Sequence, residues 1–221
     1  MAAPSEERPL GRMVPPVAAG VEIPPEPPDV GARALSIASR LLAGASTFFF
    51  LAFVFAYFYL RSLDVDHAWR PAHLGPKQGL GAAFIACILA SALLATLAGR
   101  RMKAGSRAWT APAAMSVVLG LAAVALQCIE YTVQHFGPTD GAFASVFCTW
   151  TALYLITVLF TLYWLETHIA TELRARRAPA PGGGDIKDPD RLIAPGLDAA
   201  VFFWGFLAGI GVVTYVVLYL L

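Results

Sequence analysis

Glu130 raises the first chemical question in this sequence, because its carboxylate lies inside a long apolar stretch. In GLAAVALQCIEYTV, residues 120–133, it is the only charged residue. Gln127 lies three residues earlier, so the two side chains share one face of a helix, and Tyr131 follows directly. Because burying an unpaired charge is costly, such a carboxyl group relays protons, is held by hydrogen bonds between helices, or contacts lipid or a neighbouring subunit.

The histidines and cysteines, which are common metal ligands, do not form a metal-binding pattern. No two histidines share a helix face at ligand spacing, and the cysteines form neither CxxC nor CxxxC pairs. We therefore expect no haem or metal in this chain, and cysteines that behave as small apolar residues. The residues concerned are His67, His73, His135, His168, Cys87, Cys128 and Cys148.

Signatures of a free-standing enzyme are also absent. The sequence contains no Walker, zincin, nucleophile-elbow or kinase motif. Its basic residues are grouped between apolar runs and are not interleaved with aromatic residues, so nucleic-acid binding is not indicated. The chain offers no catalytic residues of its own.

The elements that position these residues follow from composition. Of the 221 residues, 57% are hydrophobic and only 14% are charged, against roughly 25% in soluble domains. Apolar runs of about twenty residues are long enough to cross a bilayer, and such segments are helices because lipid cannot satisfy backbone groups. The sequence predicts an all-α polytopic membrane protein, a bundle of five transmembrane helices. The expected spans are about 37–60, 79–99, 111–134, 141–168 and 198–221.

The polar segments predict how the chain is divided. Residues 1–32 are rich in proline and acids and contain no apolar signal-peptide core, so we expect a disordered cytoplasmic tail. Residues 33–221 form the expected transmembrane domain. Within it, RRAPAPGGGDIKDPDR at 176–191 predicts a flexible loop before the last helix.

The basic residues predict the orientation of the bundle. With five spans, the tail and the second and fourth loops lie on one side, and together they carry thirteen of the sixteen lysines and arginines. The positive-inside rule places that side in the cytoplasm. We therefore expect a cytoplasmic N-terminus and a C-terminus outside.

Small residues recur at helical spacing in two of the spans. This spacing lets helices approach closely, so it predicts packing either within the chain or against another membrane subunit. The stripes are Ala82, Ala86 and Ala90, with Ser91, Ala95 and Gly99 beside them, and Gly205 with Gly209 in the last span.

Several short motifs follow one another along the chain. The first apolar run reads ASTFFFLAFVFAYFYLR at residues 45–61, with Trp69 and Pro71 shortly after it. The third run carries Gln-x-x-Glu-Tyr at 127–131, and DGAFASVF follows at 140–147. This ordered set resembles subunit III of the haem–copper oxidases.

The sequence departs from the family pattern at several ionisable positions. Ser46 stands where the family has an acidic residue in this helix. The family's T-G-x-H-x-x-H-V is TALYLITV at 151–158, and its Y-W-H-F-V-D is FWGFLA at 203–208. The chain is therefore identified as a divergent five-helix member, without the first two helices of the seven-helix form.

The resemblance implies an accessory, cofactor-free subunit III of a bacterial respiratory haem–copper terminal oxidase of the cytochrome c oxidase type. Such a subunit would flank and stabilise the catalytic subunit I, bind phospholipid and support proton uptake during oxygen reduction. Haem and copper are expected in the partner subunits I and II, and the chain in the bacterial plasma membrane. Two alternatives stay open: a subunit III-like partner of a quinol oxidase or nitric-oxide reductase, and a small transporter or channel.

The candidate site residues lie near the outer ends of the predicted helices. Gln127, Glu130 and Tyr131 are expected to form an interhelical polar contact, with Glu130 either neutral or paired with an outer arginine such as Arg61. The residues Tyr57, Arg61 and Trp69 are expected at the membrane interface, as an aromatic belt with a snorkelling arginine. The resemblance implies instead a clamp for a lipid headgroup. At the inner end, we expect Glu166, His168 and Glu172 on a solvated helical extension.

Overall fold

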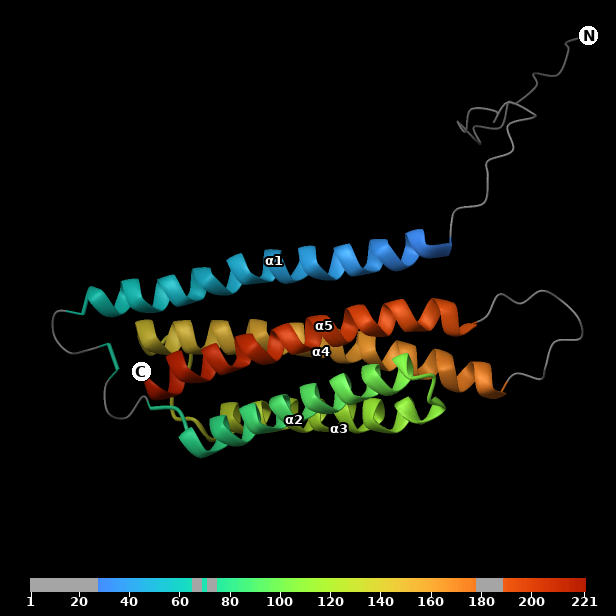
Figure 1. Ribbon diagram of the computed structural model, residues 1–221. Helices are drawn as coiled ribbons and strands as arrows, with labels where there is room; N and C mark the ends of the chain where they lie inside the picture. Colours follow the sequence, from blue (N-terminus) through green and yellow to red (C-terminus); the bar gives the residue numbers. More distant parts are fainter. Residues whose placement is uncertain (1–27, 65–68, 71–74, 178–188) are drawn as a thin grey trace, which may run out of the picture.

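The computed structural model describes residues 28–64, 69–70, 75–177 and 189–221, and these are helical apart from short turns (Figure 1). No strand occurs among these residues, so the predicted all-α fold is confirmed. The elements are α1 (Pro28–Ser62), α2 (Gln78–Lys103), the 3₁₀ turn η2 (Arg107–Trp109), α3 (Thr110–Val133), α4 (Ala142–Arg177), α5 (Pro189–Tyr215) and the π-helical turn η3 (Val216–Leu220).

Five helices in the described part of the chain are long and apolar enough to cross a membrane, as the sequence predicts. Several extend beyond the expected spans. Helix α4 has 36 residues, which is about 54 Å at 1.5 Å per residue and exceeds the roughly 30 Å of a hydrocarbon core. Helix α1 begins at Pro28, a residue type suited to the first helical position, so residues 28–32 of the expected tail are helical. Residues 1–27 of that tail and 178–188 of the expected loop lie outside the described residues.

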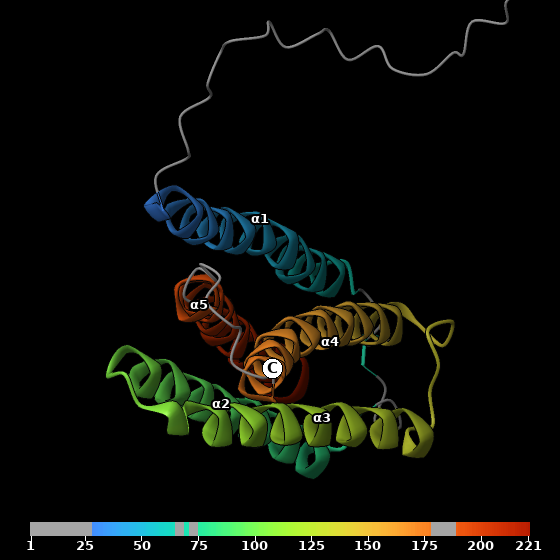
Figure 2. The same ribbon diagram turned by 90° about the vertical axis from the view of Figure 1, so that its right-hand side faces the viewer.

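The turn between α2 and α3 shows why these two helices pair. Gly105 has a φ of 72°, the left-handed conformation that ends a helix, and its N–H donates to the carbonyl of Met102 at 2.9 Å. The hydroxyl of Ser106 then accepts the N–H of Ala108 and starts η2. The tight turn makes α2 and α3 antiparallel neighbours, which are seen side by side in Figures 1 and 2.

Helix α5 is the central element of the bundle. It contacts α1, α2 and α4, while α3 packs on α2 and α4. Helix α1 lies on one side of α4 and α5, and the α2–α3 pair lies on the other (Figure 2). The start of α1, the end of α2, the end of α4 and the start of α5 share one end of the bundle (Figure 1). The cation-rich helix ends therefore gather at that end, which we call the basic end.

The interior of the bundle is built from aromatic side chains and a few hydrogen bonds between helices. The indole Nε1 of Trp204 donates to Ser91 Oγ at 3.0 Å, and Ser91 Oγ donates to the carbonyl of Ser116 at 2.6 Å. Tyr154 OH donates to the carbonyl of Leu207 at 2.9 Å. These bonds join α2, α3, α4 and α5. The largest fully buried aromatic side chains are Trp150, Trp204, Tyr57, Tyr154, Phe143, Phe147 and Phe203.

The outside of the bundle is apolar as well. Large side chains such as Leu41, Phe48, Phe55 and Ile156 are more than half exposed. Extended apolar surface of this kind is typical of a protein whose surroundings are lipid or other membrane subunits.

Candidate functional site

Glu130 is completely buried near the end of α3, where three side chains form what we call the carboxylate cluster: Gln127, Glu130 and Tyr219. Gln127 Nε2 donates to Glu130 Oε2 at 3.1 Å, because three residues along a helix place the two side chains on one face. Tyr219 OH donates to the same oxygen at 2.5 Å. Glu130 Oε1 has no hydrogen-bond partner among the described residues.

Tyr219 enters the cluster from the last turn of the chain's final helix, where the winding changes from α5 to η3. The last turn, η3, is π-helical, a form that often occurs at functional sites. The Tyr219 ring packs edge-on against Phe147 of α4, and its carbonyl accepts a bond from Gln78 Nε2 at 3.3 Å. A Cβ at Gly81 would lie 2.3 Å from the ring, so only glycine leaves room for the tyrosine at that point. The cluster thus joins α2, α3, α4 and η3.

Tyr131, which the sequence groups with Gln127 and Glu130, makes its hydrogen bond elsewhere. Its hydroxyl donates to Thr151 Oγ1 at 2.7 Å, and Thr151 in turn donates to the carbonyl of Phe147. It therefore joins α3 to α4 beside the carboxylate cluster. Sequence reasoning missed the part played by Tyr219, which is 89 residues from Glu130. A tyrosine closing the last apolar run is the only sequence signal for it.

Arg61 does not pair with Glu130. Its Nη1 donates instead to the carbonyl of Leu221 at 3.1 Å, and its guanidinium carbon lies 6.0 Å from the centre of the Tyr57 ring. Tyr57 is fully buried and packs edge-on against Trp69, which is 8% exposed. Of the three residues expected at the membrane interface, only Arg61 is exposed. The other two form part of the core, because the Trp69 ring packs edge-on against both Tyr57 and Phe143.

The stripes of small residues divide into one that faces inward and two that face outward. Ser91, Ala95 and Gly99 are buried. By contrast, Ala82 and Ala86 are exposed and Ala90 is partly exposed. Gly205 and Gly209 are also exposed, and no atom of the described residues lies within 4 Å of the position that a Cβ would take at either. Packing of these outward stripes by a neighbour therefore stays a prediction about a partner outside this chain.

At the basic end, the expected solvated extension of α4 is wrong for Glu172, which is only 6% exposed. Arg176 Nε donates to Glu172 Oε1 at 2.6 Å, and its Nη2 donates to the carbonyl of Arg107 at 2.7 Å. The extension packs against η2 and the start of α5, so its inner face is covered. Glu166 is exposed, and His168 is half-buried against Gly196. In the described part of the chain, no three His, Cys, Asp or Glu side chains are placed to hold a metal ion.

Five long apolar helices with a polar network in their interior define a multi-pass α-helical membrane protein. Residues 31–181 match the family model described as "Cytochrome c oxidase subunit III". The chain belongs to the cytochrome c oxidase subunit III family, as its resemblance to that family predicts.

Curated relatives from animals support the same family. The chain is 25% identical over 186 residues to "Cytochrome c oxidase subunit 3" of Formosania lacustris, covering 81% of this chain and 66% of the relative. It is 26% identical over 182 residues to the protein of the same name from Tachyglossus aculeatus aculeatus, covering 79% of this chain and 65% of the relative. The matched part thus spans just under two thirds of these relatives.

Proposed function

We propose that the chain is an accessory subunit III of a bacterial respiratory haem–copper terminal oxidase of the cytochrome c oxidase type. It flanks and stabilises the catalytic subunit I, binds lipid and supports proton uptake during oxygen reduction. It binds no redox cofactor itself, and haem and copper lie in subunits I and II. The observation that carries this proposal is the family match over residues 31–181.

The arrangement of the helices supports a role in assembly. The outward stripes on α2 and α5 present exposed small residues, and among the described residues nothing lies beside the two glycines of α5. Such stripes let a second helix approach closely. We propose that Ala82, Ala86, Gly205 and Gly209 contact a partner subunit or its lipids. We further propose that Gln127 and Glu130, with Tyr219, hold the helix ends in place, so that these surfaces keep a fixed shape.

The proposed membrane orientation places the basic end in the cytoplasm. The helix ends there carry Arg100, Arg101, Lys103, Arg174, Arg176 and Arg177. Because cytoplasmic loops are enriched in lysine and arginine, this favours a cytoplasmic N-terminus and an opposite C-terminal end in a bacterial plasma membrane. Reporter fusions at the two ends test this orientation. One such reporter is active only when it lies in the periplasm. Activity of that reporter in a fusion to the N-terminus would contradict the proposed orientation.

Gentle purification of the tagged full chain from its host membranes tests the assignment. We expect a haem-containing partner to co-purify and the preparation to consume oxygen with reduced cytochrome c as donor. Oxidation of a quinol instead would move the chain to a quinol oxidase, and reduction of nitric oxide to a nitric-oxide reductase. Recovery without haem, together with solute flux in liposomes that contain this chain alone, would support a transporter and contradict the proposal.

A further inference from the structure

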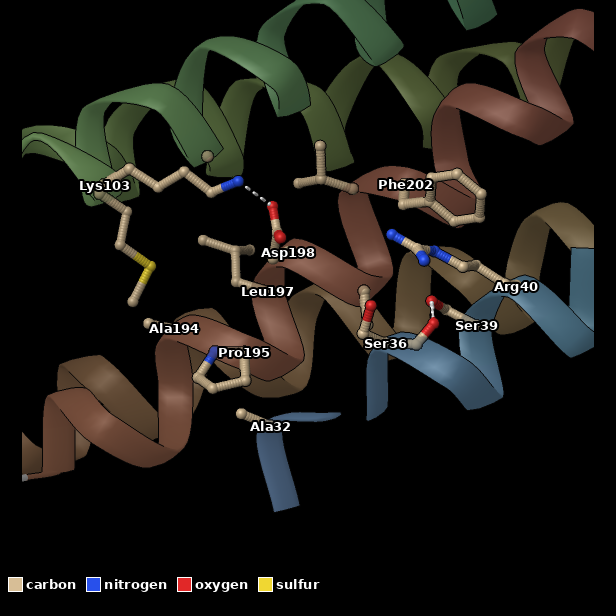
Figure 3. A pocket seen from close by; sticks show the side chains of 14 residues that line it. Ala32, Ser36, Ser39, Arg40, Lys103, Ala194, Pro195, Leu197, Asp198 and Phe202 are labelled. Atoms are coloured by element: carbon tan, nitrogen blue, oxygen red, sulfur yellow. Dashed lines mark hydrogen bonds and ion pairs between the residues drawn. The ribbon is translucent and has the colours of Figure 1, made fainter. Parts of the chain in front are cut away.

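Helix α1 is the least covered of the membrane-spanning helices in the described part of the chain. In its most apolar part 17% of the residues are buried, against 33–44% in the other four. The buried residues Ala43, Phe50 and Tyr57 recur every seven residues and face α4 and α5. Seven residues before Ala43, Ser36 of the same face lines a pocket of about 470 Å³ shared with α2 and α5 (Figure 3). The inward face of α1 therefore keeps one register along the helix.

The opposite face of α1 alternates small and large side chains. Three exposed alanines lie seven residues apart, and a large residue follows each of them after three residues. The exposed fractions of the large residues are 69% for Leu41, 79% for Phe48 and 70% for Phe55. Steps of three and four residues are the a and d positions of a coiled coil. We call these six residues the outer seam: Ala38, Leu41, Ala45, Phe48, Ala52 and Phe55.

The order of sizes in the outer seam indicates a helix as its neighbour. From Ala38 to Phe55 the seam rises about 26 Å, so it covers most of a hydrocarbon core about 30 Å thick. Lipid chains require only that a surface be apolar, and they place no condition on the order of large and small residues. Helix packing does, because large side chains of one helix fit the spaces left by small residues of the other. Small residues also let membrane helices approach closely.

The alternation also selects the direction of the neighbouring helix. In a parallel pair each position faces its own kind, so alanine layers would alternate with layers of two phenylalanine-sized residues. The distance between the two helix axes would then have to change at every layer. In an antiparallel pair an a position faces a d position, so each layer joins one small and one large residue at a constant distance.

A second copy of this chain does not supply such a helix. All copies insert in the same direction, so α1 of another copy runs parallel to this one. Helices α2 and α4 run antiparallel to α1, but their exposed residues do not alternate in size. On α2 two alanines precede two leucines, and in the middle of α4 the exposed residues are all large: Ala82, Ala86, Leu89 and Leu93 on α2, and Ile156, Phe160 and Tyr163 on α4.

We propose that the outer seam of α1 binds one transmembrane helix of a different subunit, which runs antiparallel to α1. This helix places large side chains against the alanines of the seam and small ones against its large residues. The two axes cross at about +20°, the usual angle between membrane helices. The proposal rests on the proposed role as a subunit of a membrane complex, and it names the face of α1 and the direction of the contact.

Cross-linking in the complete complex tests both the partner and its direction. Leu41→benzoylphenylalanine and Phe55→benzoylphenylalanine place a photoreactive group near each end of the outer seam. After illumination of the purified complex, mass spectrometry of the linked peptides identifies the residue bound to each group. We expect both groups to link to one helix of another subunit, at residues about fourteen apart. The residue linked to position 55 should come first in the partner's sequence.

The other outcomes of this experiment overturn the proposal. The reverse order of the two linked residues would show a parallel helix. Links to peptides of this same chain from a neighbouring copy would show self-association. Links to lipid alone, from both positions, would show that no helix covers the outer seam.

A double variant tests the order of sizes without changing composition. Ala45→Phe with Phe48→Ala exchanges a large and a small exposed residue, so hydropathy and the packing inside this chain stay the same. We expect the cross-link from position 55 to fall about tenfold, which corresponds to about 1.4 kcal/mol and lies within the range for overpacking. Leu121→Ala with Ala125→Leu, on the exposed face of α3, is the matched control and should keep the full yield.

Equal yields from the exchanged seam and the control would contradict the proposal, since they would show that the order of sizes has no effect. The unfolding free energy of each double variant, measured on the chain alone, checks that the fold is intact. Both exchanges involve exposed residues, so this value should not change.

The haem content of the same preparations separates this proposal from the proposed function. If an antiparallel helix is mapped but no preparation contains haem, the oxidase assignment fails and the outer seam stands as a subunit contact. If haem is recovered and the photoreactive groups reach only lipid, the outer seam fails and the oxidase assignment stands.

Discussion

Replacing Tyr219 by phenylalanine removes one hydroxyl from the carboxylate cluster and leaves the aromatic ring in place. The ring remains packed against Phe147 and Tyr215, so the change isolates the bond to Glu130 Oε2. After the substitution Glu130 has only Gln127 as a side-chain donor, although its carboxyl group is fully buried. The substitution is costly because a fully buried carboxyl group then loses one of its two side-chain donors and cannot replace it with water.

The loss of unfolding free energy expected for Tyr219→Phe follows from comparing two estimates of what one hydrogen bond contributes. Hydrogen bonds to charged groups in soluble proteins contribute about 1.5–3 kcal/mol. Bonds between membrane helices average about 0.6 kcal/mol with a maximum of about 1.7, because the unfolded chain in the membrane finds other partners. Because Tyr219 is one of only two side-chain donors that the described residues offer to this fully buried carboxyl group, we place Tyr219→Phe near the upper membrane value, at about 1.5 kcal/mol of unfolding free energy.

Tyr131→Phe is the matched control. It also removes one tyrosine hydroxyl from a bond between helices, but its partner Thr151 still donates to the carbonyl of Phe147. The group that loses a bond here is a neutral hydroxyl that keeps another hydrogen bond, not a buried carboxyl group, and we expect about 0.6 kcal/mol. The unfolding free energy of both variants is measured in mixed micelles, by following tryptophan fluorescence as the fraction of sodium dodecyl sulfate rises. A cost for Tyr219→Phe no greater than that for Tyr131→Phe would refute the reasoning about the cluster.

Three further predictions follow from the packing. Glu130→Gln keeps an acceptor for Tyr219 and should leave assembly, oxygen consumption and proton pumping intact, measured on the purified complex in vesicles; loss of pumping with normal assembly would instead assign Glu130 to proton transfer. Gly211→Ala should lower the unfolding free energy by about 1–3 kcal/mol through overpacking, because its Cβ would lie 2.5 Å from Tyr154 OH. Gly44→Ala, in open space on α1, should not lower it, and equal effects of the two would contradict the packing argument. Ala86→Leu should reduce recovery of the haem-containing partner without changing the unfolding of this chain, and unchanged recovery would remove α2 from the interface.

The sequence alone was sufficient for the number and type of elements. Length and hydropathy predict five membrane-spanning helices, because any segment that crosses lipid must satisfy its backbone internally. Helical spacing also predicts that Gln127 and Glu130 share a face, and they do form a hydrogen bond. The ordered motifs indicate the family that the comparison confirms.

Which faces point inward was decided only by the tertiary structure. In a membrane protein, buried and lipid-facing side chains are both apolar, so hydropathy does not separate them. The sequence therefore did not show that Ser91 and Ala95 are covered while Ala82 and Ala86, on the same helix, are exposed. It also did not show that Glu172 lies under a neighbouring turn.

The hydrogen-bond partner of Glu130 could not be predicted from the spacing of residues along one helix. Arg61 is a plausible partner by charge, and Tyr131 by adjacency, yet the bundle brings Tyr219 to the carboxyl group from the far end of the chain. Spacing along one helix fixes which residues share a face, since the helix itself sets that geometry. Contacts between helices depend on how whole surfaces pack, and in this protein that packing brings Tyr219 of η3 to the buried carboxyl group.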